Sequence, residues 1–305
     1  MAKSSNSALV IMAFFAIYVI WGSTYLLNKI AVLELEPFML ASFRFTLAGL
    51  CIFLLAKAMG TSLRITKKQL LNTLIAGILF LSIGNGLVVW ALRYVDTGFA
   101  ALEISSQPLI ILLLMRILQG KKIQPMSVVG VVLGIIGIYL LVSQKQIIAQ
   151  EESIIGMIMI FFCMLCWAYA SLFVANADLP TNYFVNTGYQ MLFAGLVLSL
   201  MSLGFGEEWT SPLVWSGKVQ LSMLLLIFLG SIVAFTSFNY LLKAVSPEKV
   251  ATSTYVNPIV ALLLGWYFLD EQITLQSIVA AAILLTGVYF INTKKTLAIF
   301  ERFKR

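Results

Sequence analysis

The chain has 305 residues, of which 61% are hydrophobic and 11% are charged, and its formal net charge is +7. This composition lies far outside that of water-soluble globular domains, so it excludes a chain that folds mainly in water. The basic residues lie in short segments between apolar runs and form no basic helix face, so nucleic-acid binding is excluded as well.

Apolar runs long enough to cross a hydrocarbon core of about 30 Å follow one another along the chain. The first run is longer than a signal-peptide core and is expected to remain as a helix. Cutting the chain at charged and at Pro- or Gly-rich breaks predicts ten transmembrane helices, near residues 8–33, 37–57, 69–92, 97–116, 124–143, 153–175, 181–204, 219–243, 247–268 and 273–292. The predicted fold class is an all-α integral membrane protein.

The loops between these runs divide the charges unequally. Fifteen Lys and Arg residues fall in one alternating set of loops and termini, against three in the opposite set, Arg93, Lys145 and Lys218. The opposite set holds acidic residues instead, among them Glu34, Glu36, Glu207, Glu208, Asp270 and Glu271. The positive-inside rule therefore predicts an even number of spans and places both termini in the cytoplasm.

The two halves of the chain are related in sequence. An offset of 146 aligns Trp21 with Trp167 and Gly49 with Gly195, and an offset of 150 aligns Pro108 with Pro258 and Gly137 with Gly287. We interpret residues 1–148 and 149–305 as two five-helix repeats within one membrane domain. Because five is odd, the second copy enters the membrane from the opposite side, and inverted repeats are typical of transporters that work by alternating access.

The sequence resembles the drug/metabolite transporter superfamily in its ten-helix EamA-type branch, over nearly the whole chain. The resemblance rests on Trp21-Gly22-Ser23-Thr24, on Arg44-Phe45, and on Tyr255-Val256-Asn257-Pro258 followed by Leu269-Asp270-Glu271. It implies secondary transport of metabolites, amino acids or amphipathic drugs, usually as export across a bacterial inner membrane. It does not name the cargo, because members of the superfamily differ widely.

Polar and aromatic side chains recur at helical spacing in several spans. Trp21, Tyr25 and Asn28 share one face of the first helix, and Trp167 and Ser171 occupy the equivalent face of the sixth. Two repeat-related tryptophans suit amphipathic or cationic cargo, although core packing explains aromatic residues equally well. The full set of candidate substrate-binding residues is Trp21, Tyr25, Asn28, Asn85, Glu103, Gln107, Trp167, Ser171, Asn239, Tyr255 and Asn257.

Two repeat-related prolines fall within the fourth and ninth spans, and we expect a bend or an opening of the helix at each. Pro108 and Pro258 remove a backbone donor and crowd the carbonyl four residues earlier. Matching interruptions in two halves point to a midplane binding site, so both prolines are candidate hinges. Glu103 and Gln107 lie four apart beside the first of them, and two readings are open for such polar residues: interhelical hydrogen bonding or a solute path.

Three charged residues, Lys29, Arg44 and Glu103, lie inside predicted spans and need partners or water. Lys29 is expected to reach the headgroups. Two interpretations of Glu103 are open: an ion pair with Arg44, which would be structural, or a protonatable gate that couples proton binding to exposure of the cavity. Protons are therefore the candidate coupling ion.

The sequence lacks the residues that several other classes of protein need. The chain contains no histidine, and its three cysteines, Cys51, Cys163 and Cys166, fall in apolar runs, so no metal site, disulfide framework or cofactor is predicted. A nucleotide-binding motif is absent, and Glu103 is the single embedded carboxyl, so an enzyme or a primary pump is not expected. The prediction is a carrier for a small molecule in a lipid bilayer; a channel or a receptor remains the alternative, and the sequence does not choose an oligomeric state.

Overall fold

The computed structural model describes residues 7–120, 124–144, 151–245, 250 and 253–292, and every regular element among them is a helix. The side chains of Lys243, Thr254 and Tyr255 are not part of that description. Much of the charge pattern on which the predicted orientation depends lies outside the described residues, namely Lys3, Lys121, Lys122, Lys145, Lys249, Lys294, Lys295, Arg302, Lys304 and Arg305.

In the first half of the chain the elements follow one another as α1 (Ser7–Phe15), η1 (Ala16–Ile20), α2 (Trp21–Val32), α3 (Pro37–Ala58), α4 (Lys67–Gly77), η2 (Ile78–Asn85), α5 (Gly86–Ala91), α6 (Thr97–Ile104), α7 (Gln107–Gln119) and α8 (Pro125–Val142). Here η1 and η2 are π-helical segments that continue the helices on either side of them. α1 to α2 and α4 to α5 are therefore two long spans.

The second half contains α10 (Glu151–Asn176), α11 (Tyr183–Gly204), the short 3-10 turn η3 (Pro212–Val214), α12 (Gly217–Leu225), the π-helical η4 (Leu226–Val233), α13 (Ala234–Ala244), α15 (Ser253–Leu269) and α16 (Leu275–Asn292). Seven helices of the described residues are long and apolar enough to cross a membrane, and three more apolar helices, Pro125–Leu141, Val256–Leu269 and Leu275–Phe290, are shorter. The chain is thus an all-helical membrane protein.

Capping residues decide where the helices begin. Thr66 accepts a hydrogen bond from the Gln69 amide at 3.1 Å, and the Gln69 side chain accepts one in return from the Thr66 amide at 3.2 Å. This reciprocal pair satisfies two backbone donors of the first turn, so α4 starts at Lys67, two residues before the predicted apolar run. Asn182 likewise accepts from the amides of Phe184 and Val185 at the start of α11.

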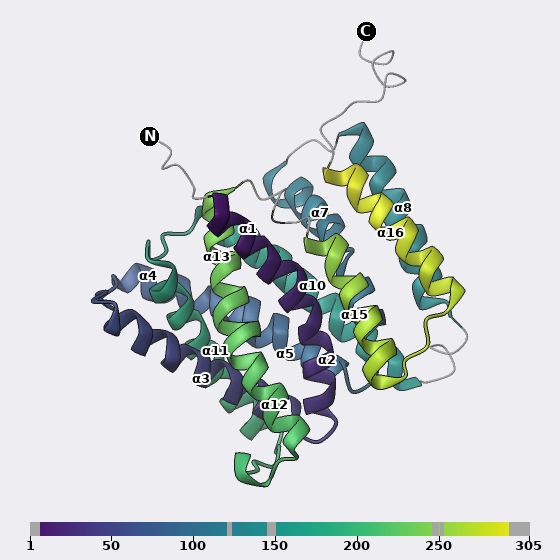
Figure 1. The fold of residues 1–305 in the computed structure, drawn as a ribbon. Helices are drawn as coiled ribbons and strands as arrows, with labels where there is room; N and C mark the ends of the chain where they lie inside the picture. Colours follow the sequence, from purple (N-terminus) through teal and green to yellow (C-terminus); the bar gives the residue numbers. More distant parts are fainter. Residues whose placement is uncertain (1–6, 121–123, 145–150, 246–249, 251–252, 293–305) are drawn as a thin grey trace.

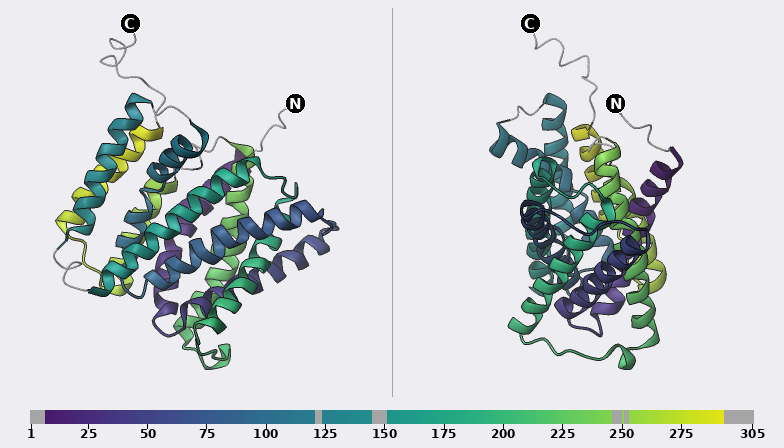
Figure 2. Two further views of the ribbon diagram at one scale, coloured as in Figure 1. Left: turned by 180° about the vertical axis from the view of Figure 1, so that it is seen from behind. Right: turned by 90° about the vertical axis from the view of Figure 1, so that its left-hand side faces the viewer.

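Two pairs of helices pack closely on either side of a central group (Figure 1). α3 lies against α11 and α8 against α16, and the view from behind shows the α8 and α16 pair along one edge of the molecule (Figure 2). A Cβ atom on Gly49 of α3 would lie 2.8 Å from Leu192 Cγ, and one on Gly137 of α8 would lie 2.6 Å from Leu284 Cγ. Glycine therefore permits the close approach in both pairs.

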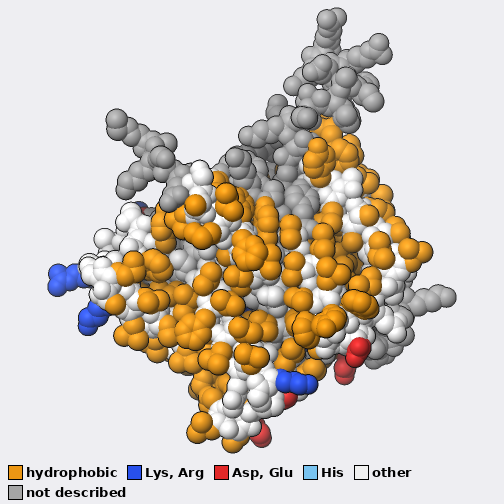
Figure 3. Space-filling view, in the orientation of Figure 1, with side chains coloured by type: hydrophobic (Ala, Val, Ile, Leu, Met, Phe, Trp, Pro, Cys, Tyr) orange, Lys and Arg blue, Asp and Glu red, His pale blue; other side chains and the backbone are white. Residues whose placement is uncertain are grey.

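On the face seen in Figure 3, the surface of the bundle is apolar over a broad band, with charged side chains gathered toward its edges. Large hydrophobic side chains such as Leu54, Ile117 and Tyr267 are exposed on it, at 69%, 75% and 70% of their surface. Hydrocarbon, and not water, is the solvent that makes such exposure favourable. The polar side chains that the sequence places within spans have to be accommodated inside the bundle.

Candidate functional site

A cavity of about 220 Å³ lies in the centre of the bundle. Its walls come from α2, α3, η2, α5, α6, α7, α10, η4, α13 and α15, so both halves of the chain contribute. Eight of the predicted binding residues line it, namely Trp21, Tyr25, Asn28, Asn85, Gln107, Trp167, Ser171 and Asn257, together with the predicted hinge Pro108. The sequence did not anticipate the contribution of α3, which supplies Arg44 and Phe45.

One wall of the cavity is aromatic. The rings of Trp21 and Trp167 meet edge to face, with centroids 6.0 Å apart and an interplanar angle of 79°. Phe238 lies 5.1 Å from Trp21 and 6.0 Å from Trp167, and Phe80 lies 4.8 Å from Trp167 behind them. Edge-to-face packing fixes these rings against one another, so they form a preformed apolar surface. The phenylalanines were not predicted, because nothing in their spacing distinguishes them from core residues.

The opposite end of the cavity is polar and centres on Arg44. Its Nε donates to Ser231 Oγ at 2.8 Å, and its Nη1 lies within hydrogen-bond distance of Asn28 Oδ1 (3.4 Å) and Asn85 Oδ1 (3.3 Å). The guanidinium carbon lies 4.8 Å from the centre of the Phe45 ring. Of the two interpretations of Glu103, the ion pair with Arg44 is not formed: among the described residues the hydrogen-bond partners of Arg44 are neutral, because its helix turns the side chain toward η2 and η4.

Two π-helical segments form the cavity wall beside Arg44. Leu81, Gly84 and Asn85 come from η2, and Gly230 and Ser231 come from η4. Ile78 and Leu226, which start the two segments, are 148 residues apart, and Asn85 and Val233, which end them, are separated by the same number. π-helical turns are rare and are frequently found at functional sites, so their repetition at one cavity favours a functional role for this part of the bundle.

Two of the predicted residues make interhelical hydrogen bonds at the edge of the cavity. Gln107 Nε2 donates to Met164 O of α10 at 3.0 Å. With the side-chain amide of Asn257 turned so that its nitrogen faces the carbonyls, Asn257 donates to Ile17 O at 2.9 Å and to Tyr18 O at 2.8 Å. These carbonyls belong to η1, so Asn257 connects α15 to the π-helical segment of the first span.

Two predicted residues, Asn239 and Glu103, are not among the described residues that line the cavity. Asn239 donates to Thr187 Oγ1 at 2.9 Å and so joins α13 to α11 away from it. Glu103 is buried, with 5% of its surface exposed, and its Oε2 has no hydrogen-bond partner among the described residues. The side chain of Tyr255 lies outside the description, and only its position in α15 is given.

The two predicted hinges differ. The fourth span is interrupted at Ser105 and Ser106, so that α6 ends at Ile104 and α7 begins at Gln107, with Pro108 in its first turn. Both serines donate to carbonyls three residues earlier, Leu102 and Glu103, which competes with helical bonding. At Pro258, by contrast, the described helix α15 continues without a break from Ser253 to Leu269, with the proline inside it.

At one face of the bundle, carboxylates from the second half hold helices of the first. Glu207 accepts from the amides of Phe38 and Met39 at 3.0 and 2.7 Å, at the start of α3. Glu271 accepts from the Thr97 amide and hydroxyl, both at 2.8 Å, at the start of α6. A carboxylate at a helix N-terminus satisfies free amides and complements the helix dipole. We call the face that holds Glu207, Glu271 and the starts of α3 and α6 the acidic face.

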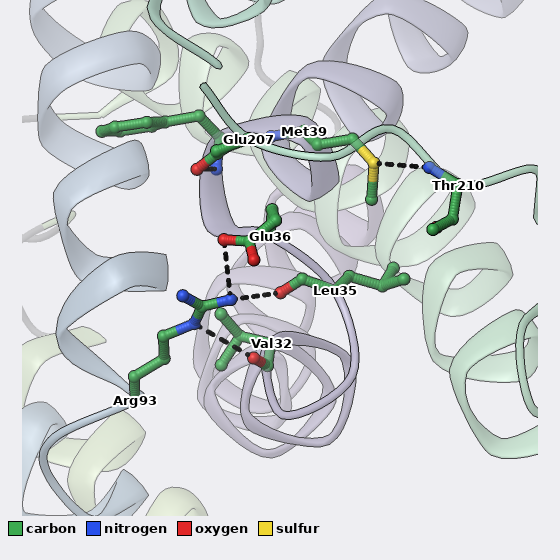
Figure 4. Close-up of polar contacts among 8 residues, drawn as sticks. Val32, Leu35, Glu36, Met39, Arg93, Glu207 and Thr210 are labelled. Carbon is green, nitrogen blue, oxygen red and sulfur yellow. Dashed lines mark hydrogen bonds and ion pairs between the residues drawn. The ribbon is translucent and has the colours of Figure 1, made fainter. Parts of the chain in front are cut away.

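Two basic side chains, Arg93 and Lys29, also bind backbone carbonyls at this face, and Figure 4 shows Arg93 with its partners. Arg93 donates to Val32 O and Leu35 O at 3.3 and 3.0 Å, and its Nη2 lies 3.0 Å from Glu36 Oε2. Lys29 Nζ donates to Leu92 O and Val95 O at 2.6 and 3.0 Å. Lys29 therefore binds the carbonyl end of the third span, where the last carbonyls of a helix are free to accept. That it also reaches the headgroups stays a prediction.

The cavity is separated from the acidic face by packed side chains. Its lining reaches no further than Asn28 and Val88 in that direction, and Val32, Leu92 and Val95 beyond them are buried in one hydrophobic cluster. Toward the opposite face, which holds the start of α1 and the end of α16 (Figure 1), the lining extends to Leu242, Val250 and Ser253. A second cavity, of about 410 Å³, lies at the acidic face itself, beside Asp96 and Glu271.

Apolar spans around a central, partly polar cavity define a multi-pass membrane protein, and comparison with known proteins gives its family. A model described as the EamA-like transporter family matches residues 8–143 and 154–293. The chain therefore belongs to the EamA-like transporter family, and it is a membrane transporter, as the resemblance implied.

Relatives in sequence agree with this assignment, and a solved structure shares the fold. The uncharacterized inner membrane transporter YedA of Escherichia coli (strain K12) is 34% identical over 294 residues, 94% of each chain. The uncharacterized transporter YoaV of Bacillus subtilis (strain 168) is 21% identical, over 93% of this chain and 96% of its own. A chain of known crystal structure has a TM-score of 0.68 at 21% identity and covers 99% of this chain and 100% of its own, which is a likeness of fold.

Proposed function

We propose that the protein is a secondary active carrier that moves a small molecule by alternating access between two inverted five-helix repeats, residues 1–148 and 149–305. The observation that carries the proposal is the central cavity, which both halves line and which is closed toward the acidic face. The described conformation then represents one of two states of the carrier. Net export from the cytoplasm across a bacterial inner membrane is the direction that the family resemblance favours, and YedA of Escherichia coli is itself named an inner membrane transporter.

Symmetric packing supports the inverted repeat. A Cβ on Gly49 would contact Leu192, and one on Gly195 would contact Thr46; both residues of each contact correspond at an offset of 146. The second pair of helices shows the same exchange at an offset of 150. A Cβ on Gly137 would contact Leu284, and one on Gly287 would contact Gly134, the residue that corresponds to Leu284. Contacts that exchange partners in this way are what a two-fold axis between the helices produces. The two matches of the family model, one in each half, agree with the same division.

The carboxylate contacts support a gate at the acidic face. Glu207 and Glu271 follow α11 and α15 of the second half, yet they bind amides of α3 and α6 in the first half. Opening that face has to separate the halves there, which would expose the helix starts to water and break these bonds. Because water then replaces the lost partners, the cost is modest, and the contacts suit a gate that opens and closes.

Glu103 is the candidate for coupling to protons. Phe99, four residues before it, lines the cavity at the acidic face, and Ile104, directly after it, lines the central cavity. Glu103 thus lies in α6 between two cavities while facing neither. A carboxyl in that place that gained and lost a proton during the cycle would connect the two sides of the membrane, and this role replaces the ion pair with Arg44.

Counterflow in proteoliposomes tests the proposal. Purified protein is reconstituted, the vesicles are preloaded with pooled amino acids, nucleosides, carboxylic acids or quaternary amines, and uptake of labelled members of each pool is measured with and without a pH gradient. Saturable exchange of any pool is expected, because a carrier returns loaded more readily than empty. Non-saturable flux would favour the alternative of a channel, and no flux from correctly folded protein would favour a receptor.

A further inference from the structure

Arg44 is the one charged side chain in the lining of the central cavity, as far as the described residues extend. It is 2% exposed and lies within the membrane-spanning part of the fold. The described part of the chain contains one ion pair, between Arg93 and Glu36, and it lies at the acidic face. No carboxylate of the described chain therefore balances the charge of Arg44, although a buried charge without a counter-ion is costly.

The hydrogen bonds of Arg44 leave part of the guanidinium free. Nε and Nη1 donate to neutral oxygens of Ser231, Asn28 and Asn85. Within the described residues Nη2 donates to no protein atom. It lies 3.3 Å from the place where a Cβ of Gly230 would be, so the absent side chain leaves space beside it. Neutral groups thus hold the guanidinium in place, and its Nη2 donor and its positive charge remain available to a ligand.

The aromatic wall begins next to this polar end. Asn85 accepts from Arg44, and its neighbour Gly84 faces Trp167, whose Cε3 would lie 3.3 Å from a Cβ there. Arg44, Trp21 and Trp167 line the same cavity, so a ligand whose charged group binds Arg44 can place an apolar body against the two tryptophans. The aromatic wall alone suited cationic cargo, but the guanidinium in the same cavity repels a cation.

We infer that the cargo of this transporter carries a carboxylate, which binds Arg44, and a small apolar body, which packs against Trp21 and Trp167. The inference rests on the proposed function. A carboxylate matches the planar guanidinium, and a single positive charge among Asn and Ser side chains balances a monoanion and not a dianion such as phosphate. Carboxylic acids and amino acids with apolar side chains share this chemistry.

Binding to the wild-type protein in detergent tests the inference without any substitution. Four ligands share one phenyl body, namely 3-phenylpropionate, L-phenylalanine, 3-phenylpropan-1-ol and 2-phenylethylamine, and calorimetry measures the affinity of each. At least one of the two carboxylates is expected to bind about tenfold or more tightly than the alcohol and the amine, the effect of a charge-assisted hydrogen bond. Comparison of 3-phenylpropionate with L-phenylalanine then distinguishes a carboxylic acid from an amino acid. Tighter binding of the amine or the alcohol, or no binding of either carboxylate, would overturn the inference.

Substitution of Arg44 supplies a second readout. Arg44→Gln should lower carboxylate affinity about tenfold or more while alcohol binding stays the same, and Arg44→Lys should retain part of the preference because it keeps the charge. Arg64→Gln, in an exposed loop, is the matched control and should change nothing. Unchanged carboxylate affinity in a folded Arg44→Gln protein would contradict the inference, and the wild-type series decides alone if that variant does not fold.

Counterflow with the same ligands separates this inference from the proposed function. Carboxylate binding without exchange would leave the ligand class intact and remove the carrier. Exchange of 2-phenylethylamine but of neither carboxylate would leave the carrier intact and remove the ligand class.

Discussion

Arg44 illustrates how far the sequence determines the surroundings of a single residue. Its depth in the membrane follows from its place in an apolar run, and the need for partners follows from that depth. The sequence paired it with Glu103 because both lie at similar depth. Depth leaves the direction of the side chain around the helix undetermined, and in the structure Arg44 points to Ser231 of the other half.

Gly230 tests the space beside Arg44. A methyl group at Gly230 would lie 3.3 Å from Arg44 Nη2 and 2.8 Å from Thr24 Cγ2, so Gly230→Ala should narrow the cavity and lower the rate of exchange. Overpacking of this kind typically costs about 1–3 kcal/mol, so a modest fall in melting temperature is expected as well. Gly217→Ala on the same span is the control, because nothing lies within 4 Å of a Cβ there. Equal exchange rates for the two variants would contradict the proposed site.

Glu103 tests proton coupling. Glu103→Gln preserves the shape of the side chain and removes the proton that it can exchange, so exchange at equilibrium should persist while stimulation by a pH gradient disappears. Counterflow with and without the gradient measures both quantities in one preparation. A pH response equal to that of the wild type would exclude Glu103 as the coupling site, and a loss of exchange without the gradient would assign it a structural role.

At the scale of the elements, carboxylates of the second half cap helices of the first, and in the proposed mechanism these contacts hold the acidic face closed. The acidic loops are visible in the sequence and help to predict the orientation of the chain, but nothing in the sequence pairs Glu207 or Glu271 with a helix start. Both residues lie far in sequence from the helices that they cap, so local patterns do not reveal the pairing. The interruption at Ser105 and Ser106 is similar: Pro108 predicted an opening, whereas the exact position depends on two serine side chains that bond to the preceding turn.

Glu271→Gln should weaken the closed acidic face. The amide oxygen still accepts hydrogen bonds but lacks the charge that favours a helix N-terminus, and such changes typically cost about 0.3–1 kcal/mol. The population with an open acidic face should therefore rise. Labelling of a cysteine introduced at Val88, at that end of the cavity, should speed up when the reagent comes from the acidic face.

Glu208→Gln is the matched control for this measurement, because Glu208 is exposed at the same face and makes no described contact with a helix start. The control should label at the wild-type rate. A Glu271→Gln protein that labels no faster than the Glu208→Gln protein would mean that the carboxylate contact does not hold the face closed.

At the scale of the whole molecule, orientation in the membrane remains a prediction from charge. The exposed loop residues Ser62 and Ser211 lie at opposite faces of the bundle. In a background where the three native cysteines are replaced by alanine, Ser211→Cys should react with a membrane-impermeant maleimide in intact cells, and Ser62→Cys should react only after the membrane is permeabilised. The reverse pattern would place the acidic face in the cytoplasm.

The sequence by itself determined the class of protein and much of its internal plan. Apolar length set the spans, because every backbone group in hydrocarbon has to bond within its own helix. Self-similarity of the halves suggested a two-fold relation, and spacing picked out eight residues that line one cavity. These properties depend on short-range patterns, which a single chain displays directly.

Tertiary structure alone decided which side chains meet. The rotation of each helix about its axis decides where its side chains point. It sets the direction of Arg44, the position of the phenylalanines beside Trp167, the capping of α3 and α6, and the absence of Glu103 and Asn239 from the described lining of the cavity. In an interior surrounded by lipid, hydrophobicity does not set that rotation, because lipid and protein are equally apolar. Close packing at a few glycines and a small number of interhelical hydrogen bonds set it instead.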